Sequence, residues 1–499
     1  MAATVPKTYP ETPLTAVPEL YRRARAAFSA WGRTAPMDRA RHLRSLRLAV
    51  VERLDHLARV IAEATGKPRV EALTTELLPV LDTLVYLEKH APRVLRRRRM
   101  PTPIFLFGKA SYVEYRPRGV VLVISPWNYP FQLAVVPVVT ALAAGNAVIL
   151  KPSEVTPAVG VAMEQLFQAA GLPDGLVQTA HGDGRLGAAL VAGKPDYIFF
   201  TGSYRTGTII QVEAAKHLIP TTLELSGHDA MIVLDDAPLE RAVHGALWGG
   251  LLNSGQTCVG VERIYVQRGV YQEFTRRLAE AAARLRQGGG DEADLGEMTW
   301  ARQVEVVKQH VADALSKGAR LVHGRPPEEW RGRTVPPVIL ADVTDEMLVC
   351  REETFGPVLT VKPVADEEEA VALANASPYG LSASVWTTDR RRGERVAGLL
   401  ETGSVVINDV IVTLANPHLP FGGVKRSGLG SYHGEAGLKA FSHEKAVMED
   451  RLGRRREVYW FPYAGKAPLF ARLLRAYFGE PRRWPVFFGA FAQLLRRSR

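Results

Sequence analysis

One cysteine stands where it could act as a nucleophile. Cys258 ends the stretch Leu251-Leu-Asn-Ser-Gly-Gln-Thr-Cys258, in which small and polar residues directly precede the sulfur. A buried structural cysteine usually lies among large apolar side chains. Here backbone amides can point toward whatever the sulfur attacks, and a polar, partly open setting favours the reactive thiolate. Cys258 is therefore a candidate nucleophile, although a lone cysteine is by itself more often structural.

A carboxyl group inside an apolar strand is the second candidate. Glu224 lies in Thr222-Leu-Glu-Leu-Ser-Gly227. Such a group is rarely buried without a partner or a function. Because desolvation raises the pKa of a carboxyl group, it suits a general base that works near neutral pH. We expect Glu224 to act as that base.

A proline-flanked loop offers a donor for a developing oxyanion. Pro126-Trp-Asn-Tyr-Pro130 follows an apolar strand-like run, and its two prolines restrict the backbone around Asn128. The side-chain amide of Asn128 could donate a hydrogen bond to a negatively charged oxygen. Taken alone, the loop favours the alternative of a structural turn held by an asparagine side chain.

The motif Lys151-Pro-Ser-Glu154 follows a buried strand and could hold a ribose. A solvated lysine is the ordinary alternative for Lys151. The carboxylate of Glu154 would accept a hydrogen bond from a ribose 2′-hydroxyl and repel a 2′-phosphate, which favours NAD. NADP stays an alternative because Lys151 can bind a phosphate.

Two glycine patterns are candidates for phosphate binding. Gly202, Ser203 and Gly207 lie between a strand and a helix start, where amides and the helix dipole suit a pyrophosphate. A plain strand–turn–helix is about equally frequent. The second pattern, Gly182 to Gly187, matches G-x-G-x-x-G but does not open the first βα unit with an acidic residue about 20 positions on. We interpret it as a decoy.

Strand-like and helix-like segments alternate in the first half of the chain. Continuous β-branched runs are typical of strands buried on both faces of a parallel sheet. The expected strands are 119–125, 147–151, 176–180 and 197–200, and the expected helices between them are 133–144 and 157–170. This alternation predicts a doubly wound sheet with ligands at the carboxyl ends of its strands.

The flanking regions follow similar patterns. Strands are expected at 230–234, 263–266, 320–323 and 404–407, with helices at 271–286 and 368–376. Helical spacing predicts helices at 21–31 and 39–64, and we interpret 96–99 as a solvated helix end. Alternation at 110–117 predicts an exposed strand.

Composition limits the class of protein. A chain of 499 residues suggests two or three domains, and two cysteines make no disulfide framework. Neither a signal-like start nor a run of roughly 18 apolar residues is seen, so we expect a cytoplasmic protein. The net charge is +11, but residues 451–499 hold twelve Lys and Arg against two Glu. Because the excess charge belongs to this tail, we do not expect nucleic-acid binding.

The basic tail has an amphipathic pattern. Leu469, Phe470, Leu473, Leu474, Tyr477 and Phe478 recur at helical spacing. Such a helix suits the interface of an anionic membrane, which would make the protein peripherally membrane-associated. The alternative is that the helix docks on the protein, over the substrate funnel or on a dimer partner. Both interpretations stay open.

Taken together, these motifs resemble the aldehyde dehydrogenase superfamily over about residues 15–450. Asn253–Cys258 resembles its nucleophile motif, Leu223–Gly227 its general-base motif and Pro126–Pro130 its oxyanion loop. Glu352-Glu353-Thr-Phe355-Gly-Pro357 resembles a cofactor motif, whose Glu353 and Phe355 are implied to hold the nicotinamide ribose and ring. Trp127 is implied to join the cofactor-binding residues. Residues 420–423 and 427–434 are most similar to the class 3, fatty-aldehyde branch.

The resemblance implies an α/β fold with a Rossmann-type cofactor domain, an α/β catalytic domain and a small β oligomerisation arm. The expected divisions are 1–225 for NAD binding, with an oligomerisation strand near 110–117, 226–424 for catalysis, 425–450 for a return segment and 451–499 for the tail. The implied activity is oxidation of a medium- or long-chain aliphatic or aromatic aldehyde to its acid. The implied enzyme is a homodimer that uses no metal.

The sequence departs from the family at one point. The family usually has Glu-Leu-Gly-Gly-Lys, whereas this chain has Glu224-Leu-Ser226-Gly-His228. The substrate class is therefore less determined than the reaction class. A CoA-acylating relative and a non-catalytic protein on the same fold remain alternatives.

Overall fold

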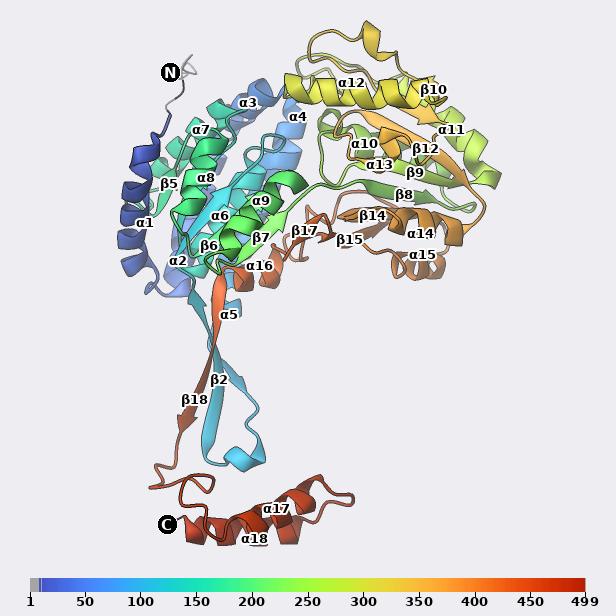
Figure 1. Cartoon of the computed structure of the whole chain (residues 1–499). Helices are drawn as coiled ribbons and strands as arrows, with labels where there is room; N and C mark the ends of the chain where they lie inside the picture. The colour runs from blue at the N-terminus through green and yellow to red at the C-terminus, as the bar shows by residue number, and fades with distance from the viewer. Residues whose placement is uncertain (1–8, 10, 499) are drawn as a thin grey trace. The chain divides into compact units, whose positions relative to one another are not determined.

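The computed structural model describes residue 9 and residues 11–498 (Figure 1). The first residues of the expected cofactor domain and Arg499 of the tail lie outside this range. The chain divides into two compact units. The larger comprises Met1–Arg96 and Tyr115–Glu444, and the smaller comprises Arg97–Glu114 and Lys445–Arg499.

The larger unit contains the predicted doubly wound sheet. Its strand order is β17-β7-β6-β3-β4-β5, and all strands are parallel except β17. The order reverses between β3 and β6, which is where α/β sheets of this type bind ligands. The strands are β3 (Val120–Ile124), β4 (Ala147–Lys151), β5 (Val177–Thr179), β6 (Tyr197–Thr201), β7 (Thr221–Glu224) and β17 (Gly428–Leu429).

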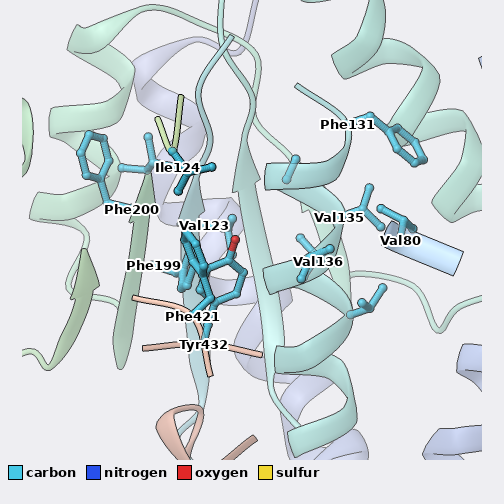
Figure 2. Close-up of a cluster of buried hydrophobic side chains, with 14 of the residues drawn as sticks. Val80, Val123, Ile124, Phe131, Val135, Val136, Phe199, Phe200, Phe421 and Tyr432 are labelled. Atoms are coloured by element: carbon cyan, nitrogen blue, oxygen red, sulfur yellow. The ribbon is translucent and has the colours of Figure 1, made fainter. Parts of the chain in front are cut away.

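Helices connect these strands and cover the sheet: α6 (Gln132–Ala144), α7 (Pro157–Ala169), α8 (Gly184–Ala192) and α9 (Tyr204–Ala215). Every residue of α6 is buried, as expected of a helix that is apolar all round. Figure 2 shows Val135 and Val136 of α6 in the same apolar cluster as Val123 of β3 and Phe199 of β6. The core of the unit thus includes side chains from β3 and β6, the two strands on either side of the switch point.

The N-terminal region is helical, as predicted, but 39–64 is not one helix. The helices are α1 (Val17–Trp31), α2 (Pro36–Glu52), α3 (Leu54–Thr65), α4 (Arg69–Glu71), the π-helical turn η2 (Ala72–Leu77) and α5 (Leu78–Val94). At Arg53 the backbone departs from a helical conformation, with φ −102° and ψ 12°. The break lets α2 pack against α5 while α3 packs against α7. Periodicity alone missed it because both helices present apolar faces.

A second sheet follows in the same unit, in the order β10-β11-β12-β9-β8-β14-β15, with only β10 antiparallel. Its strands are β8 (Asp229–Val233), β9 (Val261–Gln267), β10 (Arg320–His323), β11 (Val338–Ala341), β12 (Val358–Val364), β14 (Ser382–Trp386) and β15 (Ser404–Ile407). The sequence predicted four of these and missed β11, β12 and β14. The missed strands are short, contain Pro363, or carry serines that weaken the apolar pattern.

The remaining elements of this unit are shorter or connect the strands. The helices are α10 (Leu239–Leu251), α11 (Arg268–Ala282), α12 (Ala301–Ser316), α13 (Leu348–Arg351), α14 (Glu367–Asn375), α15 (Arg390–Ala397) and α16 (Gly434–Ala440). A two-residue pair, β13 (Tyr379–Gly380) and β16 (Val424–Lys425), runs antiparallel. The predicted helices 271–286 and 368–376 correspond to α11 and α14.

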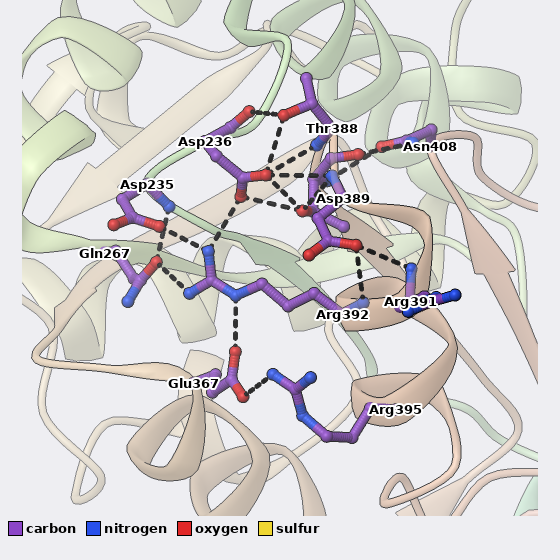
Figure 3. Close-up of polar contacts among 11 residues, drawn as sticks. Asp235, Asp236, Gln267, Glu367, Thr388, Asp389, Arg391, Arg392, Arg395 and Asn408 are labelled. Carbon is purple, nitrogen blue, oxygen red and sulfur yellow. Dashed lines mark hydrogen bonds and ion pairs between the residues drawn. The ribbon is translucent and has the colours of Figure 1, made fainter.

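A cluster of ion pairs lies at the carboxyl ends of the second sheet (Figure 3). The Arg392 guanidinium lies 2.7 Å from Asp235, 3.0 Å from Asp236 and 2.7 Å from Glu367. Asp236 also accepts hydrogen bonds from the Thr388 hydroxyl and backbone N–H. The cluster therefore ties the segments after β8 and β14 to α14 and α15.

A three-stranded sheet, in the order β1-β2-β18, begins the smaller unit and extends past its boundary. The strands are β1 (Arg98–Met100), β2 (Lys109–Pro117) and β18 (Ser442–Asp450). The exposed strand predicted at 110–117 is β2. The interpretation of 96–99 as a helix end is wrong, because Arg98 pairs with Val113 and the Arg97 guanidinium lies 3.7 Å from the Tyr112 ring centre.

The tail of the smaller unit forms two helices, α17 (Ala467–Phe478) and α18 (Trp484–Arg497). They pack together through Leu473, Phe487 and Leu494, all fully buried. The predicted apolar face of α17 is therefore partly covered by α18, while Phe478 stays exposed. Among the described residues, no helix has the length and apolar character to cross a membrane.

Candidate active site

The nucleophile loop has an unusual backbone. It follows α10 as the turn η4 (Leu252–Gly255), where Asn253, Ser254 and Gly255 have φ angles of 55°, 54° and 73°. Left-handed conformations disfavour non-glycine residues, so surrounding contacts must hold them. The Asn253 N–H donates to Glu71 at 3.1 Å, and the Ser254 hydroxyl donates to the Gly296 carbonyl at 3.0 Å. The turn thereby presents Cys258 shortly before β9.

Two glycines bring the neighbouring loops against this turn. A methyl group on Gly255 would lie 2.0 Å from the Gly356 carbonyl oxygen. One on Gly227 would lie 2.0 Å from the carbonyl oxygen of Cys258. Both distances exclude any side chain. The loops that contain Cys258, Glu224 and Glu353 therefore meet at one place.

Cys258 is partly exposed, and three carboxyl groups lie near enough for their charges to act on it. Burial, followed by the charges of Glu353, Asp229 and Glu224, raises the pKa of the thiol above its ordinary value. A raised pKa favours the protonated thiol, so a nearby base is needed to remove the proton.

Glu224, the last residue of β7, is only 4% exposed. Neither of its carboxyl oxygens has a hydrogen-bond partner among the residues that the structure describes. Burial raises the pKa of Glu224 well above its ordinary value. A buried carboxyl group without a partner is costly, and its vacant acceptors suit a water or substrate proton.

Asn128 lies in the loop after β3, and hydrogen bonds hold both its side-chain nitrogen and its backbone carbonyl. Its side-chain nitrogen donates to the Gln256 carbonyl at 3.0 Å. Its backbone carbonyl accepts from the Asn253 side chain at 2.9 Å and from Lys67 Nζ at 3.0 Å. Because an amide nitrogen carries two hydrogens, Asn128 can donate a second bond to an oxygen bound at Cys258.

The expected adenosine and phosphate residues lie at the carboxyl ends of β4 and β6, which flank β3. Lys151 ends β4 and lies 3.2 Å from the half-exposed Glu154. Ser203 caps α9 by accepting a hydrogen bond from the Thr206 N–H. Gly207 lets α9 approach Leu225, which a methyl group there would meet at 2.4 Å. A helix N-terminus at the end of β6 and a lysine at the end of β4 are groups that suit a dinucleotide pyrophosphate.

The expected nicotinamide residues lie close to the catalytic loops. The Phe355 and Trp127 rings meet edge to face with centres 5.5 Å apart. Glu353 accepts hydrogen bonds from the Gly227 N–H at 2.9 Å and from the Ser226 hydroxyl. Burial raises the pKa of Glu353 to about 7. The departure from the family motif at Ser226 thus touches a residue implied to bind the cofactor.

The glycine pattern 182–187 occupies a different place. It follows β5, the edge strand of the first sheet, and α8 begins at Gly184 with Asp183 as its cap. Gly187 leaves room for the Lys151 side chain, which a methyl group would meet at 3.5 Å. The interpretation of the pattern as a decoy stays a prediction.

Sequence reasoning missed several charged residues around the site. Glu262 accepts the N–H groups of Thr354 at 2.8 Å and Phe355 at 2.9 Å, which orients the motif implied to hold the nicotinamide. Lys67 and Glu76 form a buried ion pair beside the Asn128 loop. For Glu262 the available signal was a carboxyl group inside a strand-like run.

The comparisons with known proteins decide the family. The model of the aldehyde dehydrogenase family matches residues 2–447. The chain belongs to the aldehyde dehydrogenase family. A relative from Methylomonas sp, 4,4′-diapolycopene aldehyde oxidase, is 47% identical over 89% of this chain and 83% of its own length. Betaine aldehyde dehydrogenase of Cereibacter sphaeroides (strain ATCC 17029 / ATH 2.4.9) is 36% identical over 89% and 91%.

Solved aldehyde dehydrogenase structures share the fold. The Mycobacterium tuberculosis aldehyde dehydrogenase complexed with NAD+ has a TM-score of 0.83 and 33% identity, covering 89% of this chain and 92% of that one. An NADP-dependent enzyme of E. coli has a TM-score of 0.85 and 34% identity, covering 88% and 91%. The predicted fold, superfamily and NAD(P) dependence are therefore confirmed.

As an aldehyde dehydrogenase, the protein is an oxidoreductase that converts aldehydes to acids. The relatives do not single out the predicted class 3, fatty-aldehyde branch. That branch, the roles of individual residues and the domain divisions stay predictions.

Proposed function

We propose that this aldehyde dehydrogenase works by covalent catalysis at Cys258, with Glu224 as general base and Asn128 as oxyanion donor. The observation that carries the proposal is the buried carboxyl group of Glu224, whose oxygens have no partner among the described residues while its loop contacts the Cys258 backbone. Once ionised, a carboxyl group without a partner can take a proton from a thiol or a water.

In this proposal the reaction passes through a tetrahedral adduct and then a thioester on Cys258. The Cys258 sulfur forms a bond to the aldehyde carbon, and its proton passes to Glu224. Asn128 Nδ2 and the Cys258 N–H donate to the oxygen that becomes negative. Loss of hydride from the tetrahedral carbon leaves a thioester on Cys258. Glu224 releases the thiol proton to solvent and then accepts one from the water that attacks the thioester. The acid leaves as Glu224 returns this second proton to the sulfur.

Bound NAD(P) supplies the hydride acceptor for this reaction. We propose that Gly202, Ser203 and Gly207 hold its pyrophosphate and that Lys151 and Glu154 hold its adenosine ribose. Glu353, Phe355 and Trp127 would orient the nicotinamide end beside Cys258. The support is that these groups share the carboxyl edge of the first sheet or contact the nucleophile loop.

Replacing the nucleophile tests the proposal. Cys258→Ala should abolish NADH formation while cofactor binding, followed by fluorescence, persists. The matched control is Cys350→Ala, which changes the only other cysteine and should keep normal turnover. Wild-type turnover in Cys258→Ala would overturn the assignment.

We propose an apolar aldehyde as substrate, either a medium- or long-chain aliphatic one, as in the class 3 branch, or an aromatic one. The 47% identical relative is named for 4,4′-diapolycopene aldehyde, so that compound joins the candidates. Rates measured across aldehyde chain lengths, with an aromatic and a polyene aldehyde included, test the proposal. A preference for short, charged aldehydes would contradict it.

Hydrolysis is favoured over transfer to CoA because the chain retains Glu224 as a water activator. Product analysis distinguishes the two reactions. Free acid that forms without added CoA supports hydrolysis, whereas turnover that requires CoA and yields acyl-CoA supports transfer.

We propose a preference for NAD over NADP. The half-exposed Glu154 carboxylate would lie close to a ribose 2′-phosphate and repel it. The KM for NADP should exceed that for NAD, and Glu154→Gln should narrow the difference. A lower KM for NADP in the wild-type enzyme would contradict this preference.

We propose that the tail contacts anionic membranes. Phe461, Phe478 and Phe488 are 73%, 68% and 55% exposed in a segment rich in arginine. Aromatic side chains with basic neighbours suit an anionic lipid interface. Replacing these three residues by serine in the full chain should reduce sedimentation with anionic vesicles, whereas Leu218→Ser, at a more exposed site elsewhere, should not.

We further propose that 1–225 is the cofactor domain, 226–424 the catalytic domain and 425–450 a return segment. In this proposal β2 and β18 form an arm that pairs two chains into a dimer. Light scattering should then give the mass of two chains, and proline substitutions in β2 should lower it to that of one.

A further inference from the structure

A fully buried ion pair lies under the loop that contains Asn128. Lys67 Nζ is 2.7 Å from Glu76, and both side chains have no exposed surface. Apolar residues of similar size often stabilise a fold as well as a buried ion pair does. Stability alone therefore does not explain why charges occupy this position.

The two charges hold opposite ends of the Asn128 loop. Lys67 Nζ donates to the Asn128 carbonyl at 3.0 Å. Glu76 accepts from the Phe131 N–H at 2.7 Å and from the Gln132 N–H at 3.2 Å, where α6 begins. Free N–H groups at a helix start are good partners for a carboxylate. The pair therefore fixes the backbone on both sides of the loop.

The same segment also reaches the nucleophile loop. The Tyr129 ring lies 4.2 Å from Lys67 Nζ, and its hydroxyl is 2.6 Å from Thr257 Oγ1, one residue before Cys258. Glu71, four residues after Lys67, accepts the Asn253 N–H. Both loops thus rest on one short stretch of the N-terminal helical region.

We propose that Lys67 and Glu76 are positioning residues that set the distance between the Asn128 amide and Cys258. The inference rests on the proposed role of Asn128. Donors to an oxyanion must be placed within a few tenths of an ångström to act fully, and a displacement of about 1 Å can cost about 100-fold in rate. Losing the pair should therefore lower kcat through Asn128 without affecting the nucleotide sites.

The variant Lys67→Met/Glu76→Gln tests this without leaving an unpaired buried charge. The side-chain amide oxygen introduced at position 76 can still accept the two α6 amides, so the main change is the loss of the bond to the Asn128 carbonyl. We expect kcat to fall about 10- to 100-fold, while the KM for NAD and the alkylation rate of Cys258 stay near wild type. The control is Arg47→Met/Glu88→Gln, which makes the same kind of change at a partly buried ion pair between α2 and α5 and should keep kcat.

A double-mutant cycle with Asn128→Ala separates positioning from general destabilisation. If the pair acts through Asn128, adding Lys67→Met/Glu76→Gln to Asn128→Ala should cost little further activity. Lys67→Gln, which keeps a donor, should lie between wild type and the double variant, and it enters the same cycle if the double variant does not fold. Additive losses, or wild-type kcat with a lower melting temperature, would overturn the proposal.

The cycle also distinguishes two kinds of failure. Should Asn128→Ala itself keep wild-type kcat, the proposed role of Asn128 in catalysis is wrong. Should Asn128→Ala lose activity while Lys67→Met/Glu76→Gln does not, only the positioning role is wrong.

Discussion

The carboxyl ends of the two parallel sheets differ in how their polar groups are satisfied. In the first sheet Glu224 ends β7 with both carboxyl oxygens unpartnered among the described residues. In the second sheet Asp235 and Asp236, just past β8, are bound by Arg392 and neighbouring hydroxyl groups (Figure 3). Satisfied charges hold elements together, whereas an unsatisfied buried carboxyl group is available for a ligand.

The position of each sheet explains the difference. Cys258 comes shortly before β9, and Phe355 shortly before β12, so the second sheet contributes its amino ends to the candidate site. The first sheet contributes its carboxyl ends through Asn128 and Glu224. The carboxyl ends of the second sheet contribute nothing to the candidate site, and ion pairs there connect the neighbouring segments instead.

The largest expected effect comes from Glu224→Gln, which removes the proposed base and keeps the shape. We expect kcat to fall about 100- to 10,000-fold, the range typical of general-base loss. Steady-state NADH formation measures it, with Glu213→Gln, at a partly exposed position in α9, as control. Unchanged kcat would mean that the unpartnered carboxyl group has no catalytic function.

Asn128→Ala should have the next largest effect. Removing one oxyanion donor typically lowers kcat about 100- to 1000-fold. The KM for NAD should change little, because Asn128 contacts the catalytic loops. A loss confined to KM would assign Asn128 to substrate binding instead.

Arg392→Met should show the opposite behaviour to Glu224→Gln. Three ion pairs of about 0.2–1 kcal/mol each, discounted for solvent, suggest about 1–2 kcal/mol of lost stability. Denaturant unfolding at low and high salt measures it, and the loss should shrink as salt rises. Activity at moderate temperature should stay normal. A large fall in kcat would show that the carboxyl ends of the second sheet also serve catalysis.

The smallest expected effect is a pH dependence of stability. Folding raises the pKa of Glu224, so between its unfolded and folded pKa values only the unfolded chain releases the proton. Rising pH through that window therefore favours unfolding. Compared with wild type, Glu224→Gln should gain melting temperature at pH 8 relative to pH 5. An equal difference at both pH values would show that Glu224 does not titrate on unfolding.

Local sequence patterns predicted many of the strands and the residue types of the candidate site. The β-branched runs indicated β3 and β4 because strands buried on both faces need continuous apolar residues. Short motifs singled out Cys258, Glu224 and Asn128 because nucleophile, base and donor each need a particular residue type. The strands β11, β12 and β14 escaped because short or interrupted apolar runs carry little periodicity.

The sequence by itself determined the residue types of the site and the alternation that builds a doubly wound sheet, since both depend on neighbours within a few positions. Only the tertiary structure decided that Lys67 and Glu76 lie under the Asn128 loop and that Glu224 has no partner among the described residues. Such facts depend on contacts between distant residues, as when Glu71 binds the Asn253 N–H across 182 positions, and no local pattern encodes them. Burial then sets what each charge does, because a carboxyl group shielded from water interacts far more strongly with its nearest neighbours.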